Sequence, residues 1–280
     1  MPSLAATLRT QGFRPSKRLG QNFLIDPVVP EMIVRHADVH PGDAVVEIGP
    51  GTGSLTRPLL DHLGELWCIE RDRRLEPLLQ TLLSPADGSR LHLHFGDALS
   101  FDFSALSQEI GRSLKIVANL PYSISTPILF HLLRHRSAVQ SMTLMFQTEV
   151  ADRLMASPNS KTYGALTINT QLWATVQPRM RVPPEAFHPR PKVESTVVTL
   201  TIRPKPAVAV NDPDTMTLLV QAAFNQRRKT LANALKSVVT DPKIALNSAE
   251  IDPKRRGETL TVAEFGHLSN TVQNLGLLRT

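Results

Sequence analysis

The chain has 280 residues, 41% of them hydrophobic and 20% charged, which is typical of a soluble globular protein with one large and one smaller domain. No apolar run approaches the roughly 18 residues of a transmembrane helix, and the N-terminus lacks the pattern of a secretory signal, so we expect neither a membrane nor a secreted protein. The single cysteine excludes a disulfide framework and fits a reducing cytoplasm, while the net charge of +6 favours a polyanionic partner.

The first 25 residues form a basic arm that contains no aspartate or glutamate. Its later cations, Arg14, Lys17 and Arg18, are candidate nucleic-acid contacts. The arm ends where Asp26 and Pro27 give the N-cap and first-turn proline of a helix, and the following residues show helical spacing of apolar positions. We therefore expect the folded domain to begin at residue 26.

A short apolar strand at 44–48 runs directly into the glycine loop GPGTG. Gly49, Gly51 and Gly53 lack the Cβ atoms that would hold a ligand away from the backbone. A helix at 54–63 follows, and its N-terminal amides would face a ligand lying over the loop. The pattern predicts a nucleotide-cofactor cradle, although an ordinary tight turn has the same composition.

The spacing around this loop narrows the choice of ligand. Glu47 precedes the first glycine, and the third glycine comes one place earlier than in the Gly-x-Gly-x-x-Gly pattern of dinucleotide folds. Glu70 ends a second apolar strand at 66–70, about 20 positions after the first glycine, where a ribose-binding carboxylate is expected. This spacing supports a nucleotide cofactor but does not separate nicotinamide cofactors from S-adenosylmethionine.

Strands and helices then alternate along the chain, which predicts an α/β fold with a doubly wound parallel sheet and its ligand beyond the carboxyl ends of the strands. The expected strands are 44–48, 66–70, 91–95, 114–118 and 141–146, and the expected helices are 54–63, 73–83, 126–135 and 148–156. Cys68 lies inside an expected strand, where a small core residue is favoured over a nucleophile. The histidines lack the spacing of a metal site, so no metal centre is predicted.

Two polar signals follow strands of this sheet. Asp97 comes after the third strand and could accept a hydrogen bond from the exocyclic amine of an adenine, although a turn aspartate fits equally. Asn119-Leu120-Pro121-Tyr122 comes after the fourth strand, and its proline stiffens the turn. The Asn119 amide and a neighbouring carbonyl can then act as two fixed acceptors beneath a base held by the Tyr122 ring.

This arrangement suits methylation of an adenine amine. The amine nitrogen is a poor nucleophile, and two acceptors aimed at its N–H bonds favour the transition state, in which that nitrogen turns tetrahedral and gains positive charge. The base must be single-stranded, loop-held or flipped, and it would stack on an aromatic ring. Phe187 could supply the second stacking face, although a core aromatic on a proline-rich loop is the alternative.

The proline-rich segment after residue 178 and the alternating strand STVVTLTI predict a late hairpin that completes the sheet. After a linker at 203–206, helical patterns near 212–224, 229–239 and 261–275 predict a small helical C-terminal domain. Basic clusters at 227–229 and 254–256 each fit a solvated surface, but together with the arm they favour RNA or DNA. The predicted domains are thus 1–25, 26–203 and 204–280, and Arg227, Arg228 and Lys229 join the candidate RNA contacts.

At this point the sequence strongly resembles the ribosomal RNA adenine dimethyltransferases that act on small-subunit RNA, the KsgA type. The resemblance covers nearly the whole chain, through KRLGQNFL at 17–24, the glycine loop, the NLPY motif at 119–122, the segment from Phe187 to Val193-Glu194-Ser195, and FNQRRKTL at 224–231. It implies a Rossmann-like methyltransferase sheet with a small all-helical C-terminal domain. The implied activity is N6,N6-dimethylation of two neighbouring adenosines in a hairpin loop near the 3′ end of small-subunit (16S) rRNA during subunit maturation.

The resemblance also assigns roles to residues of this chain. The implied S-adenosylmethionine contacts are Asn22, Leu24, Gly49, Gly51, Glu70, Asp97 and Asn119. Asn22 and Leu24 would close over the methionine end, Glu70 would hold the ribose, and Asp97 would hold the adenine amine. The implied catalytic residues are Asn119, Leu120, Pro121, Tyr122 and Phe187. The implied partner is the small ribosomal subunit, and we expect a cytoplasmic monomer.

Three alternatives remain open at the level of sequence. A large-subunit rRNA adenine methyltransferase of the macrolide-resistance type shares the chemistry, although the long tail and the segment beginning at Phe187 favour the small-subunit enzyme. A nicotinamide dehydrogenase is disfavoured by the glycine spacing. The basic clusters also permit a protein that acts mainly as an assembly or checkpoint factor on immature small subunits.

Overall fold

The computed structural model describes residues 13–81 and 89–279, so the first twelve residues of the predicted basic arm lie outside the described residues. The chain divides into two compact units. The first comprises Met1–Ala151 and Gln177–Ile202, and the second comprises Asp152–Val176 and Arg203–Thr280. Within the described ranges, no helix is both long and apolar enough to cross a membrane.

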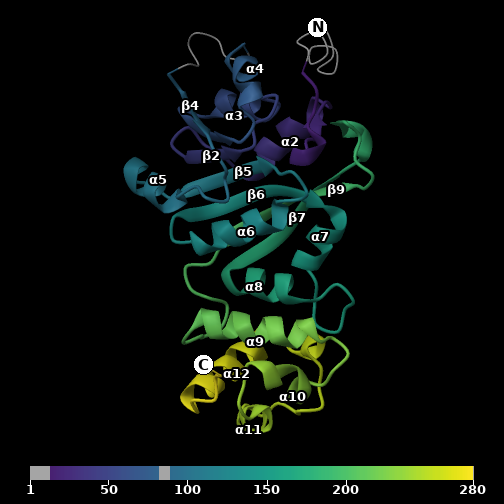
Figure 1. Ribbon diagram of the computed structural model, residues 1–280. Helices are drawn as coiled ribbons and strands as arrows, with labels where there is room; N and C mark the ends of the chain where they lie inside the picture. The colour runs from purple at the N-terminus through teal and green to yellow at the C-terminus, as the bar shows by residue number, and fades with distance from the viewer. Residues whose placement is uncertain (1–12, 82–88, 280) are drawn as a thin grey trace. The chain divides into compact units, whose positions relative to one another are not determined.

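The first unit is built on a seven-stranded sheet with the order β4-β3-β2-β5-β6-β9-β7 (Figure 1). Its strands are β2 (Ala44–Ile48), β3 (Leu66–Glu70), β4 (Leu91–Phe95), β5 (Leu114–Asn119), β6 (Val139–Gln147), β7 (Ala174–Val182) and β9 (Ser195–Ile202). The five neighbouring strands β4, β3, β2, β5 and β6 pair in parallel, whereas β9 runs antiparallel to β6. The predicted doubly wound α/β fold is therefore confirmed, and β9 and β7 extend the sheet beyond β6.

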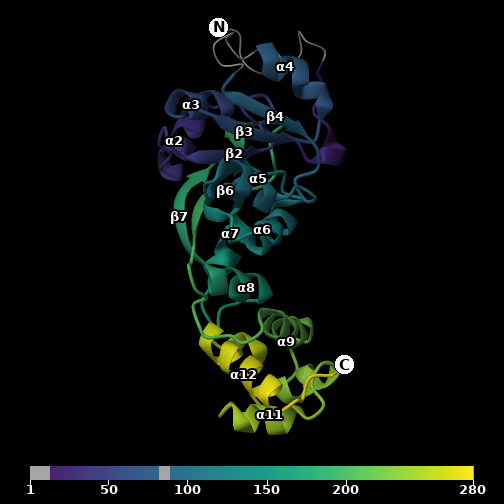
Figure 2. The same ribbon diagram turned by 90° about the vertical axis from the view of Figure 1, so that its left-hand side faces the viewer.

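The inner strands form where the sequence offers continuous apolar runs. All five residues of β2 are buried, and so are the first five of β5, as expected for parallel strands covered on both faces. Helices α2 (Val28–Ala37) and α3 (Thr56–His62) pack on one face, where α2 contacts β5, β6 and β9. Helices α5 (Phe103–Ile110) and α6 (Ser125–Arg134) lie on the opposite side (Figure 2), as right-handed crossovers require.

The strand order reverses between β2 and β5, which are neighbours in the sheet although β3 and β4 separate them along the chain. Loops that leave the carboxyl ends of two such strands diverge to opposite faces and open a crevice between them. The glycine loop leaves β2 and the NLPY turn leaves β5, so the topology brings these two motifs together.

Two features of this unit were not predicted from the sequence. Strand β1 (Phe23–Leu24) pairs with β8 (Phe187–His188), and this two-residue ladder joins the end of the arm to the proline-rich segment. Helix α5 was also missed, although Asp102 accepts hydrogen bonds from the amides of Ser104 and Ala105 at its start and Gly111 is left-handed at its end. The predicted helix at 73–83 is a 3₁₀ turn (Arg73–Leu75) followed by α4 (Glu76–Thr81) in the described part of that range.

The second unit is helical and has its own core. It contains α8 (Ala165–Trp173), α9 (Pro213–Asn225), α10 (Leu231–Ala234), α11 (Pro242–Ser248) and α12 (Val262–Asn274). The predicted domain boundary placed 152–176 with the sheet, whereas α8 contacts α9 and α12 and is therefore grouped with the helical unit. Helix α7 (Thr148–Leu154) lies across the division at residue 151.

Helices α9, α11 and α12 of the second unit begin at side-chain caps. Asp212 caps α9, Asp241 caps α11 and Thr261 caps α12, and in the first two a proline occupies the first turn. The patterns near 212–224 and 261–275 correspond to α9 and α12. The predicted helix at 229–239 is shorter, because α10 ends at Ala234 and a 3₁₀ turn (Leu235–Ser237) follows. Helices α8 and α11 were not predicted.

Candidate functional site

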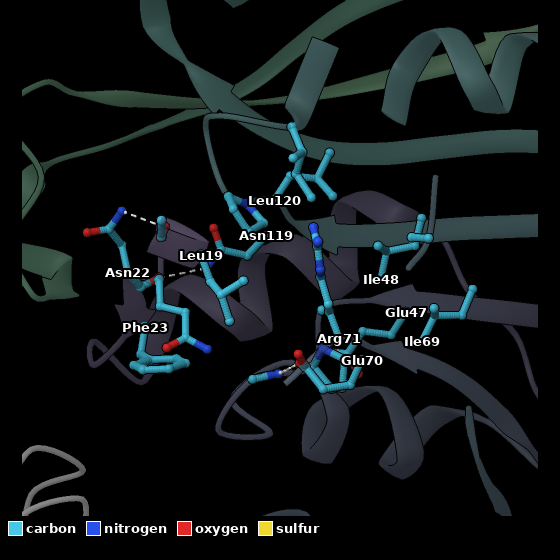
Figure 3. A pocket seen from close by; sticks show the side chains of 18 of the residues that line it. Leu19, Asn22, Phe23, Glu47, Ile48, Ile69, Glu70, Arg71, Asn119 and Leu120 are labelled. Atoms are coloured by element: carbon cyan, nitrogen blue, oxygen red, sulfur yellow. Dashed lines mark hydrogen bonds between the residues drawn. The ribbon is translucent and has the colours of Figure 1, made fainter. Parts of the chain in front are cut away.

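A pocket opens at the carboxyl ends of the parallel strands in the first unit (Figure 3). Its walls come from the arm at 18–24, the glycine loop after β2, the residues that end β3, the turn after β4 and the turn after β5. All the predicted cofactor contacts line this one pocket: Asn22, Leu24, Gly49, Gly51, Glu70, Asp97 and Asn119. Topology alone thus gathers residues that are widely separated along the chain.

The glycine loop leaves room for a ligand at one position and for a neighbouring ring at another. Gly49 has a φ of +71°, and a Cβ added there would meet nothing within 4 Å, so the space above its backbone is open. Gly51 has a φ of +58°, and its Cβ would come within 3.1 Å of the Phe23 ring. A side chain at either position would be strained, and at Gly49 it would also intrude on the open space.

Glu70 presents a carboxylate that the backbone already holds in place. Its Oε2 accepts a hydrogen bond from the Gly51 amide at 3.1 Å, and its Oε1 accepts from the Asp72 amide at 2.8 Å. The residue is only 6% exposed, and burial raises the pKa of its carboxyl. Each oxygen keeps a further lone pair, so this carboxylate can accept hydrogen bonds from vicinal hydroxyl groups in the pocket.

Asp97 lies at the same pocket beside a cation that sequence reasoning missed. Its Oδ1 accepts from the Leu99 amide at 3.0 Å, and its Oδ2 forms an ion pair with the Arg71 guanidinium at 3.3 Å. Arg71 also lines the pocket, and its side chain is labelled among the lining residues in Figure 3. A ligand amine that binds Asp97 must therefore share this carboxylate with Arg71 or displace it.

A backbone carbonyl of the arm fixes the orientation of the Asn119 side chain at the end of β5. The Asn119 Nδ2 donates to the carbonyl oxygen of Asn22 at 3.3 Å, which leaves the Asn119 Oδ1 as the acceptor of this amide. The turn after β5 is closed by the Ile124 amide, which donates to the Pro121 carbonyl at 3.1 Å. The Ser125 hydroxyl donates to the Tyr122 carbonyl at 3.1 Å. Leu120, Pro121 and Tyr122 line the pocket with Asn119.

Tyr122 is half-buried, and its hydroxyl oxygen lies 2.7 Å from the Oγ of Ser195, the first residue of β9. Burial raises the pKa of the Tyr122 phenol, so the ring carries no charge near neutral pH. A neutral aromatic ring at the pocket wall is a suitable surface for a stacked base.

Phe187 is not among the residues that line the pocket. It pairs with Leu24 in the β1–β8 ladder, is 3% exposed, and belongs to a hydrophobic cluster that also contains Val29 and Ile33. In this conformation its ring serves as core, which is the alternative considered for it from the sequence. Its role in base stacking stays a prediction.

The candidate RNA contacts fall into three situations. Arg14 and Arg18 are exposed, Arg18 lines the pocket, and the backbone of Lys17 begins a 3₁₀ turn (Lys17–Leu19). Arg227 donates to the carbonyl oxygens of Lys161 at 3.2 Å and Tyr163 at 2.6 Å. Arg228 and Lys229 are exposed. The Arg227 guanidinium thus binds backbone carbonyls of the second unit. Its role as an RNA contact stays a prediction.

Glu47 lines the pocket and is 1% exposed. Its Oε2 accepts from the Thr56 hydroxyl at 2.7 Å and from the Cys68 thiol at 3.4 Å, whereas its Oε1 has no hydrogen-bond partner among the described residues. Burial raises its pKa to about 7. The only sequence signal for a special role of Glu47 was the presence of an acid within an otherwise apolar strand.

Comparison with known proteins gives concordant results. The family model for ribosomal RNA adenine dimethylase matches residues 12–274. A ribosomal RNA small subunit methyltransferase A of Magnetococcus marinus is 50% identical over 264 residues, covering 94% of each chain, and that of Moorella thermoacetica is 47% identical over 279 residues, covering 96% of each. The crystal structure of a dimethyladenosine transferase from Plasmodium falciparum aligns with a TM-score of 0.74 at 26% identity, covering 91% of this chain and 99% of that one.

Proposed function

Because this chain belongs to the ribosomal RNA adenine dimethylase family, we propose that it converts two adjacent adenosines of small-subunit (16S) rRNA to their N6,N6-dimethyl forms. The proposed target lies in a hairpin loop near the 3′ end of that RNA, and the methyl donor is S-adenosylmethionine. The observation that carries the proposal is the Asn119 amide, whose nitrogen is held by the Asn22 carbonyl at 3.3 Å and whose oxygen is thereby left for an amine.

The chemistry of the pocket walls supports S-adenosylmethionine as the cofactor. The open space above Gly49 would admit the cofactor close to the backbone, and the fixed carboxylate of Glu70 would accept from the ribose hydroxyls. Asp97 would accept from the adenine amine, while Asn22 and Leu24 would enclose the methionine end. When bound, S-adenosylmethionine supplies an activated methyl group on a positively charged sulfur.

The residues of the NLPY turn would act on the target amine. Its lone pair is delocalised into the purine ring, so the nitrogen must become tetrahedral before it can attack. The Asn119 Oδ1 would accept from one N–H bond. The Pro121 carbonyl already accepts from the Ile124 amide, so we assign the second acceptor role to the carbonyl of Leu120. Both acceptors bind more strongly as the nitrogen gains positive charge, and neither needs to act as a base, because the methylated nitrogen is acidic enough to release its proton to water after transfer. In the second transfer only one N–H bond remains, so only one of the two acceptors can bind it.

The target base has to reach this turn outside a helical stack. A loop-held or flipped adenine would stack on the Tyr122 ring, which would contribute about 1 to 3 kcal/mol. Phe187 remains the proposed second stacking face, and this role requires β8 to expose a ring that is 3% exposed in the structure.

The basic residues would hold the RNA without reading its sequence. Arg14, Arg18, Arg228 and Lys229 are exposed and are proposed to meet phosphates. Lys17 lies beside Arg18 in the arm, and Arg227 lies beside Arg228 in the C-terminal cluster. Arg227 would contribute mainly by stabilising the second unit through its bonds to backbone carbonyls. We further propose that the protein acts as a cytoplasmic monomer on maturing small subunits.

The test is to incubate the protein with labelled S-adenosylmethionine and small subunits that lack the modification, and then to map the labelled nucleosides. N6,N6-dimethyladenosine at two adjacent positions of the small-subunit RNA is the expected result. Label in large-subunit RNA would favour the macrolide-resistance alternative. Tight binding to immature small subunits without any label would favour a purely assembly-related protein. Either of these two results would contradict the proposal.

A further inference from the structure

Ser195 is the last residue of the segment Val193-Glu194-Ser195 and the first residue of β9. The residue is fully buried, and its Oγ lies 2.7 Å from the hydroxyl oxygen of Tyr122. Tyr122 lines the pocket, whereas Ser195 does not. The buried Ser195 hydroxyl therefore does not contact the pocket itself. It can affect the site only through the Tyr122 ring, on which the target base would stack.

Topology explains how a residue of β9 comes to this place. Strand β9 runs antiparallel to β6, and Ser195 is the register partner of Gln147, the last residue of β6. Because the neighbouring strands are parallel to β6, their carboxyl ends lie at the same edge as the beginning of β9. The first side chain of the antiparallel strand β9 therefore lies at the edge of the sheet where the parallel strands end.

The strand around Ser195 is held by one backbone contact and one side-chain contact. The Thr148 amide donates to the Glu194 carbonyl at 3.0 Å, and the Thr148 and Thr196 hydroxyl oxygens lie 2.9 Å apart. These contacts fix the strand immediately before and after Ser195. The serine hydroxyl is therefore a rigid partner for the tyrosine rather than a mobile one.

On the premise of the proposed function, we propose that Ser195 is a positioning residue that fixes the direction in which the Tyr122 ring projects at the pocket wall. The turn at 119–122 fixes the near end of this ring through the Ser125 bond to the Tyr122 carbonyl at 3.1 Å. The Ser195 bond fixes the far end at the phenol oxygen. With both ends held, a stacked adenine presents its amine to the Asn119 oxygen in one orientation, and small errors in such alignment are costly in rate.

The experiment is a double-mutant cycle of Ser195→Ala and Tyr122→Phe, read as the single-turnover rate of methyl transfer to unmodified small subunits. Each single variant should lose about three- to tenfold in rate, as expected for one neutral hydrogen bond. The double variant should lose no more than either single variant, because both changes remove the same bond. RNA affinity and KM should stay within about twofold of wild type, since the stacking ring is retained.

The matched control is Thr143→Val, which removes a buried hydroxyl from a pair between β6 and β9, the Thr143 and Thr199 oxygens at 3.3 Å. It should leave the transfer rate unchanged. Any one of three results would overturn the inference. The control could lose as much rate as Ser195→Ala, the Ser195→Ala rate could stay within twofold of wild type, or the losses of the two single variants could multiply in the double variant. If Ser195→Ala fails to fold, Tyr122→Phe still removes the bond without leaving a cavity in β9. Absence of transfer by the wild type would instead refute the proposed function.

Discussion

The buried carboxyl of Glu47 makes the stability of the sheet depend on pH in a way that can be calculated and tested. Glu47 is 1% exposed, and its pKa is about 7 in the folded protein against an ordinary value of 4.5. Between these two values the unfolded chain loses the proton while the folded chain keeps it, so the stability falls as the pH rises. The shift corresponds to a loss of about 1 kcal/mol at pH 5 and about 3 kcal/mol at pH 8.

Cys68 provides the assay, because it is the only cysteine of the chain and is fully buried. It is the register partner of Glu47 in the neighbouring strand, and its Sγ lies 3.4 Å from the Glu47 Oε2. Its labelling by a thiol reagent, divided by the labelling rate of the unfolded chain, measures the equilibrium for opening these strands. Glu47→Gln removes the titrating proton and keeps the shape of the side chain.

We expect the equilibrium constant for opening of the wild type, divided by that of Glu47→Gln, to rise roughly 70-fold between pH 5 and pH 8. Taking this ratio cancels the other groups that titrate in the same range. Glu109→Gln, at an exposed position of α5, is the control and should follow the wild type. A ratio that changes less than threefold would show that Glu47 is ionised in the folded protein, and the reasoning from burial would be refuted.

Two further predictions concern cofactor and RNA. Asp97→Ala should weaken binding of S-adenosylmethionine at least tenfold by calorimetry, because a hydrogen bond to a charged group is lost, whereas Arg71→Met should change it less than fivefold, because an exposed ion pair contributes little. Equal effects of the two changes would contradict the role of Asp97. Arg228→Gln with Lys229→Gln should weaken RNA binding and reduce the slope of log affinity against log salt by about 1.5, and an unchanged slope would show that neither residue meets phosphate.

The residues that line the pocket at the ends of the strands could be predicted to lie together, because their placement depends on local patterns and on one topological rule. Apolar runs located the strands, and the rule that ligands bind at carboxyl ends of parallel strands joined the glycine loop to Glu70, Asp97 and Asn119. The two-residue pairing of Leu24 with Phe187 leaves no periodic signal, so the sequence could not show that this ring is buried.

Side-chain partners were the other part that could not be predicted. A basic cluster in a sequence shows charge but not what the charge contacts, and Arg227 donates to two backbone carbonyls of its own unit. The contact of Ser195 with Tyr122 depends on the antiparallel placement of β9, which required the fold. The missed helix α5 is different in kind, because its caps at Asp102 and Gly111 were visible in the sequence.

The most direct test of the proposed chemistry is the single-turnover rate of methyl transfer by Asn119→Ala, measured at saturating cofactor and RNA. Loss of one acceptor from the developing ammonium should slow transfer by about 100- to 1000-fold, by analogy with removal of one oxyanion-hole donor. Retained RNA affinity would locate the loss in the chemical step. A rate within threefold of wild type would contradict the assignment of the Asn119 oxygen to the target amine.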